Sequence, residues 1–435
     1  MDKARDTAAR ILKAVHEEGA YANVALVREL RRAGLDDVSR RFVTEMVYGA
    51  VKAGESLDWI LCRYANRPLG KIPPMIREIL RLGIYQLFYM NKVPASAACN
   101  EAVELAKKYS HPGTAKFVNA VLRRATREPG LAKFPEGRTA ERLALTSSHP
   151  LWLTKRWIRE FGYEEARKLC EFNNGQPSLS LRTNTLKIGR EELLDRLARE
   201  GVEAVPSVWT PEGILCSSHG SLDDFPALRD GYCQVQDESS MLVAHVLSPK
   251  PGEFILDVCS APGGKATHIA ALMKNQGRIL AMDIHPHKLQ RVEENARRLG
   301  IDIIETECMD ARAAGEKYPG QVDGVLVDAP CSGLGVLRRK PDSRWRKKPE
   351  DLVKLPKLQL AILRSAAEAV KPGGTLVYST CTLTSEENGQ VVEAFLKERG
   401  EFHLEGTGDF LPTLQLYPQR DGTDGFFIAR MRKNG

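Results

Sequence analysis

The sequence predicts three parts: an all-helical N-terminal domain, a small α+β middle unit, and a C-terminal α/β domain built on a mostly parallel sheet. Apolar residues recur at helical spacing through residues 1–145. Short alternating strands accompany helical segments between residues 146 and 236. From residue 237 to residue 435, near-continuous apolar strands alternate with helices, which is typical of a parallel sheet covered on both faces. We therefore expect domain boundaries close to residues 145 and 236.

Composition limits the functional classes that fit this chain. Of the 435 residues, 27% are charged and 43% hydrophobic, and no run approaches the roughly 18 apolar residues that cross a membrane. The N-terminus lacks the apolar stretch of a secretory signal, so we expect a cytoplasmic protein without a membrane partner. Nine cysteines without a Cys-x-x-Cys pair argue against a zinc site and a disulfide framework, and we expect no metal.

Positive charge is concentrated in the N-terminal third. Residues 1–150 carry a net charge of +9, whereas the remainder carries −2. Such an excess is typical of modules that bind polyanions, although a basic soluble domain has the same signature. The helices expected here lie near residues 8–15, 42–47, 76–83, 98–108 and 115–124, and a stretch rich in helix breakers, 129–150, marks the end of the domain.

The later elements follow in order along the chain. In the middle unit we expect a helix over 152–170, a strand over 179–184, a helix over 191–200 and strands over 202–208 and 213–216. In the C-terminal domain we expect strands over 254–258, 278–283, 301–306, 325–328, 374–379 and 426–431, with helices over 287–299 and 358–370. Open α/β sheets bind ligands beyond the carboxyl ends of their strands, so candidate site residues are sought there.

A glycine-containing loop follows the first of the parallel strands. It reads Asp257-Val-Cys-Ser-Ala-Pro-Gly-Gly-Lys265. The glycines let the backbone approach a ligand, and the next helix offers free N–H groups to a phosphate or to the carboxylate of an amino acid. The G-x-G-x-x-G spacing of dinucleotide-binding loops is absent, and so is the lysine followed by serine or threonine of the Walker motif. Nicotinamide, flavin and ATP are therefore disfavoured as ligands.

Aspartates follow the next two strands. Asp283 lies 19 residues after Gly264, close to the spacing at which a carboxylate binds ribose hydroxyls. Asp310, after the third strand, is placed to accept a hydrogen bond from an adenine amine. Ribose recognition without a pyrophosphate site, combined with an amino-acid carboxylate, indicates S-adenosylmethionine. Each aspartate taken alone has a simpler explanation as a loop carboxylate or a helix cap.

Two cysteines follow the fourth and fifth strands. Cys331 lies in Asp328-Ala-Pro-Cys-Ser-Gly, and Cys381 lies in Ser379-Thr-Cys-Thr. A thiolate that adds to carbon 6 of cytosine makes carbon 5 nucleophilic enough to take a methyl group, after which a base removes the carbon 5 proton. Cysteine in place of an aromatic residue after the proline favours a carbon target over an exocyclic amine. Asp328 would polarise the ring, and we expect burial to favour its protonated form.

These motifs resemble the RNA cytosine-5 methyltransferases of the Sun/Fmu (NOL/NOP) family. The resemblance rests on the glycine-containing loop, with Ser260 where the family usually has alanine, on the Pro-Cys loop with its following Arg338-Arg-Lys-Pro-Asp, and on Tyr-Ser-Thr-Cys. Near the N-terminus, Asn100-Glu-Ala-Val-Glu-Leu-Ala-Lys and Phe117-Val-Asn-Ala-Val-Leu-Arg-Arg are similar to the RNA-binding fold of the antitermination factor NusB. The resemblance therefore extends over nearly the whole chain.

The resemblance implies a fold and a set of roles. The fold is a Rossmann-like class I methyltransferase domain with a seven-stranded, mostly parallel sheet over 237–435, a NusB-like domain over 1–145 and an RNA-recognition-like unit over 146–236. In this family the nucleophile is the cysteine of the Thr-Cys motif, here Cys381, whereas Cys331 assists product release. The implied cofactor contacts are Cys259, Ser260, Ala261, Pro262, Gly263, Gly264, Lys265, Asp283, Asp310 and Asp328.

A basic run follows the Pro-Cys loop. Residues 338–348 include seven Lys or Arg and one Asp, a net charge of +6. Such runs are usually solvated surface, but beside a catalytic loop we expect contacts to RNA phosphates, with Trp345 stacking on a base. The residues expected to bind RNA are Arg338, Arg339, Lys340, Arg344 and Arg346.

The sequence is therefore interpreted as that of an enzyme that methylates carbon 5 of a cytosine in 16S ribosomal RNA. We expect S-adenosylmethionine as its cofactor, RNA affinity from the N-terminal domain, and a monomer in solution. A transfer-RNA cytosine-5 methyltransferase is the nearest alternative. A non-catalytic RNA-binding or antitermination adaptor is a second, opposed by the intact cysteines, aspartates and paired glycines. A DNA enzyme is disfavoured by the Ser-Thr-Cys sequence.

Overall fold

The computed structural model of the protein describes residues 2–217 and 225–435. These form two compact units. Unit 1 comprises Met1–Asn174 and Lys340–Arg346, and unit 2 comprises Gly175–Arg339 and Lys347–Gly435. The middle unit expected over 146–236, part of which lies outside the described residues, is divided between these two units. Its expected helix over 152–170 belongs to unit 1, whereas its expected helix over 191–200 and its strands belong to unit 2.

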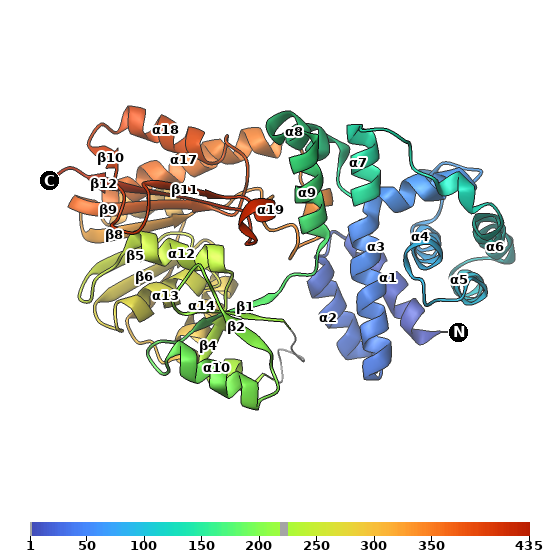
Figure 1. Ribbon diagram of the computed structural model, residues 1–435, viewed down its shortest axis with the longest axis horizontal. Coiled ribbons are helices and arrows are strands. Elements are labelled where there is room, and N and C mark those ends of the chain that lie inside the picture. Colours follow the sequence, from blue (N-terminus) through green and yellow to red (C-terminus); the bar gives the residue numbers. More distant parts are fainter. Residues whose placement is uncertain (1, 218–224) are drawn as a thin grey trace. The chain divides into compact units, whose positions relative to one another are not determined.

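Unit 1 is helical, as the sequence predicts (Figure 1). Its core is formed by apolar side chains at helical spacing on the first six helices, such as Leu12, Met46, Leu80 and Val118. No helix among the described residues is long and apolar enough to cross a membrane. The helices are α1 (Lys3–Glu17), α2 (Ala22–Ala33), α3 (Asp37–Tyr64), α4 (Pro74–Tyr89), α5 (Ala95–Tyr109), α6 (Pro112–Arg127), α7 (Ala140–Ser147), α8 (Leu151–Phe161) and α9 (Tyr163–Asn174).

Two details of unit 1 differ from the sequence prediction. The single helix expected over 152–170 is split into α8 and α9, because Gly162 adopts a backbone conformation with a φ of +80° that interrupts the helix. The stretch 129–150, rich in helix breakers and expected to mark the domain boundary, contains α7. The Thr139 side chain caps this helix by accepting a hydrogen bond of 3.1 Å from the backbone N–H of Arg142.

Unit 2 begins with a small antiparallel sheet. Its strands are β1 (Leu179–Thr183), β2 (Ala204–Pro206), β3 (Gly213–Cys216) and β4 (Cys233–Val235), in the order β2-β3-β1-β4. The helices α10 (Arg190–Arg199) and α11 (Pro226–Arg229) accompany it. Leu181, Leu193, Ile214 and Cys233 share one apolar core, which explains why the sheet forms around the central strand β1.

The larger sheet of unit 2 has the predicted mostly parallel topology. Seven strands lie in the order β10-β12-β9-β8-β5-β6-β7, and an eighth, β11, pairs with β12. The run from β9 to β7 is parallel, whereas β10, β11 and β12 are antiparallel to their neighbours. The strands are β5 (Phe254–Asp257), β6 (Arg278–Asp283), β7 (Ile304–Cys308), β8 (Val322–Asp328), β9 (Val370–Thr380), β10 (Phe402–Leu404), β11 (Thr413–Leu416) and β12 (Phe426–Lys433).

Helices cover both faces of this sheet (Figure 1). One face packs against α12 (Glu238–Leu247), α13 (Gly264–Leu272) and α14 (Pro286–Leu299). The other packs against α15 (Ala314–Lys317), α17 (Asp351–Ala369) and α18 (Gly389–Glu398). The short helix α19 (Pro418–Asp421) precedes β12, and α16 (Ser343–Arg346) belongs to unit 1. Because both faces are buried, the central strands are apolar throughout, which is what made them visible in the sequence.

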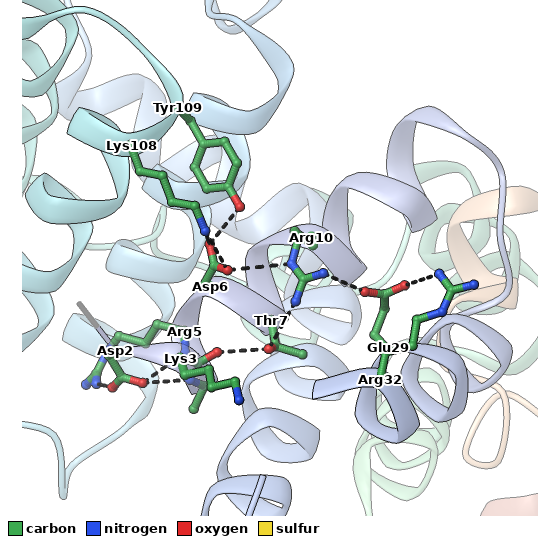
Figure 2. A network of polar contacts seen from close by, with 11 residues as sticks. Asp2, Lys3, Arg5, Asp6, Thr7, Arg10, Glu29, Arg32, Lys108 and Tyr109 are labelled. Atoms are coloured by element: carbon green, nitrogen blue, oxygen red, sulfur yellow. Dashed lines mark hydrogen bonds and ion pairs between the residues drawn. The ribbon is translucent and has the colours of Figure 1, made fainter. Parts of the chain in front are cut away.

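A network of charged side chains joins helices within unit 1 (Figure 2). The Asp6 carboxylate on α1 accepts hydrogen bonds from Lys108 Nζ at 3.0 Å and from the Tyr109 hydroxyl at 2.7 Å, both at the end of α5. Arg10 binds Glu29 of α2 at 2.9 Å. The Asp6 side chain is only 10% exposed, so these partners compensate a charge that is largely withdrawn from water.

Replacing Asp6 by alanine should therefore destabilise unit 1. The Lys108 ammonium and the Tyr109 hydroxyl lose their shared acceptor, and we expect a loss of about 2–3 kcal/mol in the free energy of unfolding. Urea unfolding followed by circular dichroism measures this change. Glu104→Ala is the matched control, since Glu104 forms an exposed ion pair with Lys107 on the same helix and should unfold like the wild type. Equal stability of the two variants would contradict the assignment.

Candidate functional site

The functional groups gather where the parallel strands of unit 2 end. β5, β6, β8 and β9 end at Asp257, Asp283, Asp328 and Thr380, and their parallel pairing puts these ends at one edge of the sheet. Asp328 is the register partner of Ser379, two residues before Cys381. The topology thus brings the aspartates and cysteines of distant motifs to one place, as expected from their positions after successive strands.

The loop between β5 and α13 has the shape of a ligand cradle. Gly263 has a φ of +94°, and a β-carbon at this position would lie 3.0 Å from Val292 Cγ1 on α14. Glycine is therefore required for both conformation and space. Helix α13 begins at Gly264, so its first backbone N–H groups have no partners within the helix and can bind an anionic group.

Asp257 lies buried at the base of this loop and was not singled out from the sequence. Neither of its carboxylate oxygens, nor the Ser260 hydroxyl, makes a hydrogen bond of good geometry within the part of the chain that the structure describes, although the Ser260 side chain and the Cys259 backbone lie close enough to act on the Asp257 pKa. Burial, aided by the nearby Asp328 charge, raises the pKa of Asp257 to about 7. Unpartnered buried polar atoms are rare in folded proteins, and here they mark a place where a ligand supplies the partners.

The two aspartates expected to contact a nucleoside differ in the structure. One carboxylate oxygen of Asp283 accepts a hydrogen bond from the backbone N–H of His285 at 2.9 Å. Asp310 is bound by Arg312, whose guanidinium reaches one oxygen at 2.6 Å and whose backbone N–H reaches the other at 2.9 Å. These hydrogen bonds lower the pKa of Asp310. Asp310 therefore has the geometry of a turn cap, the simpler of the two readings of this residue.

Asp328 is held by two side chains at the edge of the sheet. Lys265 Nζ lies 2.7 Å from Asp328 Oδ2, and the Ser379 hydroxyl donates to Oδ1 at 2.9 Å. The Asp328 side chain is 30% exposed. The burial expected for Asp328 is therefore not found, and its carboxyl group instead contacts an ammonium group. The Lys265 side chain, at the end of the glycine-containing loop between β5 and α13 (the cofactor loop), thus points to Asp328.

Cys331 and Cys381 face one another directly. Their sulfur atoms are 3.3 Å apart. The hydrogen bond to Cys381, followed by burial, raises the pKa of the Cys331 thiol well above its usual value. Cys331 therefore keeps its proton more firmly than a free thiol. Either sulfur can be the donor in the contact between them.

A buried carboxylate that sequence reasoning missed fixes the two cysteine loops. Glu387 accepts hydrogen bonds from the backbone N–H of Ser332 at 2.7 Å, from the Ser332 hydroxyl at 2.5 Å and from the Thr384 hydroxyl at 2.7 Å. Gln359 of α17 donates to it at 3.1 Å. Ser332 follows Cys331, and Thr384 lies three residues after Cys381. Glu387 therefore sets the relative position of the two sulfurs, although no motif around it has a recognisable spacing.

The basic run after the Pro-Cys loop binds protein groups rather than presenting a row of free cations. Arg339 donates to Asp424 at 2.7 Å and to Asp237 at 2.5 Å, all within unit 2. Arg338 lies 3.9 Å from Asp424, and Lys340 is exposed. Of the five residues expected to bind RNA, Lys340 is the one whose side chain the structure leaves open to solvent.

The part of this run that belongs to unit 1 is inserted among its helices. Arg344 is fully buried and donates to the Ser148 carbonyl and Asn174 Oδ1, each at 2.9 Å, and to the Asn173 carbonyl at 3.2 Å. Arg346 donates to the Gly19 carbonyl at 2.9 Å. The expected phosphate contact is therefore wrong for Arg344, because the side chain has no surface to offer. The sequence showed the charge but not the distant carbonyl groups that bind it.

Trp345 has a packing role in the same segment. Its indole N–H donates to the Val51 carbonyl at 2.8 Å. Gly54 interrupts the regular helical geometry of α3 with a φ of +35°, and a β-carbon there would overlap the indole ring. The helix is distorted at the place where the ring packs, so the expected stacking of Trp345 on a base does not fit this arrangement.

The fold and site match known proteins over the full chain. Family profiles match residues 244–432 (16S rRNA methyltransferase RsmB/F), 2–127 (NusB family) and 149–223 (RsmF/B-like ferredoxin-like domain). A probable ribosomal RNA small subunit methyltransferase B from Bacillus subtilis (strain 168) is 44% identical over 99% of both chains.

Solved structures agree with this match. The crystal structure of PH0851 superposes with a TM-score of 0.84 at 28% identity, covering 100% of this chain and 99% of the other. NSun6 from Pyrococcus horikoshii, solved with SFG, superposes with a TM-score of 0.59 at 27% identity, covering 65% of this chain and 97% of the other. The fold and site define a Rossmann-like methyltransferase joined to a NusB domain. More particularly, the chain belongs to the RsmB/F family of 16S rRNA methyltransferases.

The separation of the two sulfurs predicts that a thiol oxidant joins them. A disulfide bond is about 2.05 Å long, so a small movement suffices. Diamide should take one hydrogen from each thiol and leave a Cys331–Cys381 disulfide. Peptide mapping by mass spectrometry without reductant identifies the linked pair, and dithiothreitol should reverse it. Cys331→Ser is the control that cannot form it. A wild-type protein that keeps both thiols, or links either one to another cysteine, would contradict the observed geometry.

The burial of Arg344 predicts a structural role that an exposed neighbour lacks. Arg344→Met leaves the Ser148 and Asn173 carbonyls without a donor and should lower the free energy of unfolding of unit 1 by about 2–4 kcal/mol. Lys348→Met removes an exposed charge from the same run and should unfold like the wild type. Thermal unfolding of both variants gives the comparison. If Arg344→Met melted like the wild type while losing RNA affinity, the phosphate-binding expectation would be restored.

Proposed function

We propose that the protein transfers a methyl group from S-adenosylmethionine to carbon 5 of a cytosine in 16S ribosomal RNA, through a covalent bond from Cys381 to carbon 6. The observation that carries this proposal is the pair of sulfurs 3.3 Å apart at the ends of β8 and β9. Its full-length relative is named a probable ribosomal RNA small subunit methyltransferase B, which supports the substrate.

The cofactor loop fits S-adenosylmethionine. The unpartnered carboxylate of Asp257, the position of Gly263 and the free N–H groups at the start of α13 suit an amino-acid ligand. Asp283 is the ribose-binding candidate, whereas Arg312 already occupies the Asp310 carboxylate. The bound cofactor supplies an electrophilic methyl group. The related NSun6 structure holds SFG, an analogue of this cofactor, which supports the same ligand here.

The chemistry of the protein residues begins at Cys381. Its thiolate forms a bond to carbon 6, the electrons of the C5–C6 double bond make carbon 5 nucleophilic, and the ring nitrogen takes up a proton. Once carbon 5 carries the methyl group, a base removes its remaining proton. The double bond then re-forms, the ring nitrogen gives up its proton, and the bond from carbon 6 to the Cys381 sulfur breaks with its electron pair going to the sulfur.

Lys265 and Asp328 act on the ring in this proposal. The Asp328 carboxylate accepts a hydrogen bond from the exocyclic amine, which orients the base. The Lys265 ammonium, 2.7 Å from Asp328, is the nearest cation and stabilises negative charge as it develops on the ring. This assignment replaces a protonated Asp328 with a carboxylate and an ammonium that share the task.

Cys331 acts after methyl transfer. Its raised pKa keeps it protonated beside Cys381, so it can return a proton to the sulfur that is leaving carbon 6. RNA affinity is assigned to unit 1, which carries most of the net +9 of residues 1–150 and whose first 127 residues match the NusB family. Lys340 is the one exposed candidate retained from the basic run.

Substituting the two cysteines separates their proposed roles. Cys381→Ala should abolish transfer of labelled methyl groups to 16S ribosomal RNA, because no bond to carbon 6 forms. Cys331→Ala should still attack and should accumulate a protein–RNA adduct, since release is slowed. Scintillation counting measures transfer, and a denaturing gel detects the adduct as a slowly migrating band.

The control is Cys308→Ala, which removes an exposed thiol at the end of β7 and should behave like the wild type. An adduct formed by Cys381→Ala and not by Cys331→Ala would reverse the two roles. Undiminished transfer by Cys381→Ala would reject the covalent mechanism. Bisulfite sequencing of the RNA product then tests whether carbon 5 of a cytosine is the methylated atom.

A further inference from the structure

Unit 2 contains a cluster of metal-binding side chains outside the methyl-transfer site. Glu212 precedes β3, His245 lies on α12 and His268 lies on α13. Their donor atoms all lie within 4.8 Å of one another. This cluster could not be predicted from the sequence, because the three residues are far apart along the chain and share no short motif.

The donor atoms converge on the Glu212 carboxylate. His245 Nε2 lies 2.9 Å from Oε1 and 3.1 Å from Oε2, and His268 Nε2 lies 2.8 Å from Oε1. The side chains of Glu212 and His268 are 6% and 1% exposed. Neither ring nitrogen of His268 makes a hydrogen bond of acceptable geometry with any residue in the described ranges. A fully buried imidazole with both nitrogens unsatisfied is costly unless a ligand binds it.

We propose that Glu212, His245 and His268 form a binding site for a divalent transition-metal ion, and that Zn²⁺ is the ion the donor set fits best. Two imidazole nitrogens and one carboxylate are a known set of protein ligands for zinc. At zinc bond lengths near 2.0–2.1 Å, tetrahedral ligands are separated by about 3.3 Å. The separations of 2.8–2.9 Å between the imidazole nitrogens and Glu212 Oε1 need to widen by only a few tenths of an ångström. His245 is 19% exposed and provides a path for the ion and a water as fourth ligand.

The electrostatic surroundings of the three side chains suit a cation. Burial lowers the pKa of His268 to about 4, which disfavours a positive charge on the ring. Burial opposes ionisation of Glu212, but the adjacent His245 and His268 side chains outweigh it and hold the pKa of the Glu212 carboxyl below its usual range. The cation that faces the cluster is Arg182 on β1. It is bound to Gln236 and to the Thr267 hydroxyl, and it limits the net charge that the site tolerates.

A bound ion would connect three elements of unit 2. Glu212 belongs to the turn before β3 of the small sheet, whereas His245 and His268 belong to helices that pack on the large sheet. His268 lies four residues after Gly264, in the middle of α13, the helix that follows the loop between β5 and α13. The ion would therefore join the small sheet to the helix that supports the cofactor loop, and its effect is on stability rather than on the chemical step.

Cobalt is the probe for this site, since Co²⁺ takes zinc ligands and absorbs visible light. The untagged full-length protein is stripped with a chelator, reduced, and titrated with Co²⁺ at pH 7.5. We expect a visible absorption band that saturates at one ion per chain, disappears on adding Zn²⁺, and is accompanied by a higher melting temperature. His245→Gln should lose the band and the rise in melting temperature, and its half-buried position makes it the variant most tolerant of substitution.

The matched control removes the other histidine pair. His285 and His287 are exposed neighbours whose rings lie 5.6 Å apart, and they are the obvious place for adventitious binding. The double variant His285→Gln/His287→Gln should keep the Co²⁺ band. The proposal is overturned if the wild type shows no saturable band, if His245→Gln binds as tightly as the wild type, or if only the double variant loses binding. Because the readouts are absorption and melting temperature, the outcome does not depend on methyl transfer.

Discussion

The parallel pairing of β8 with β9 is the constraint on which the rest of the site depends. Asp328 is opposite Ser379 in the register of these strands, so the residues that follow, Cys331 and Cys381, leave the sheet side by side. A slip of one residue would turn the side chains of one strand to the opposite face and separate these groups. Glu387 then fixes the two loops beyond the strands, where backbone pairing no longer does so. The pairing of the strands brings the two cysteine loops close together, and the buried Glu387 carboxylate fixes their relative orientation.

Charge in this protein is used for structure as much as for binding. The basic run was predicted to be an RNA-binding surface, yet Arg339 and Arg344 donate hydrogen bonds to protein acceptors within their own units. Buried arginine fits this role because its planar donors can satisfy several acceptors at once. The residues 340–346 thereby become part of unit 1 although the sequence around them belongs to unit 2. The net charge of residues 338–348 therefore overstated the number of positively charged side chains that are available to bind RNA.

The features that could be predicted from the sequence are those that depend on residues close together in the chain. The apolar strands, the glycine-containing loop and the positions of Cys331 and Cys381 follow from periodicity and from motifs that are continuous in the chain. Asp257, Glu387 and the Glu212 cluster escaped prediction because their environments are made by residues from several elements. The contact between Asp328 and Lys265 was missed for the same reason: the two residues are 63 positions apart in the chain. Long-range contacts decide the electrostatics of a site, and local sequence does not contain them.

The hydrogen bond between the two thiols links the steps of the proposed reaction. Two sulfurs 3.3 Å apart do not ionise independently, because a negative charge on one opposes a negative charge on the other. Loss of a proton from Cys381 therefore strengthens the hold of Cys331 on its own proton. The group needed later as an acid is thus kept protonated by the ionisation that creates the nucleophile. When Cys381 bonds to carbon 6 its charge disappears, and Cys331 returns toward ordinary thiol acidity just before a proton donor is required for release.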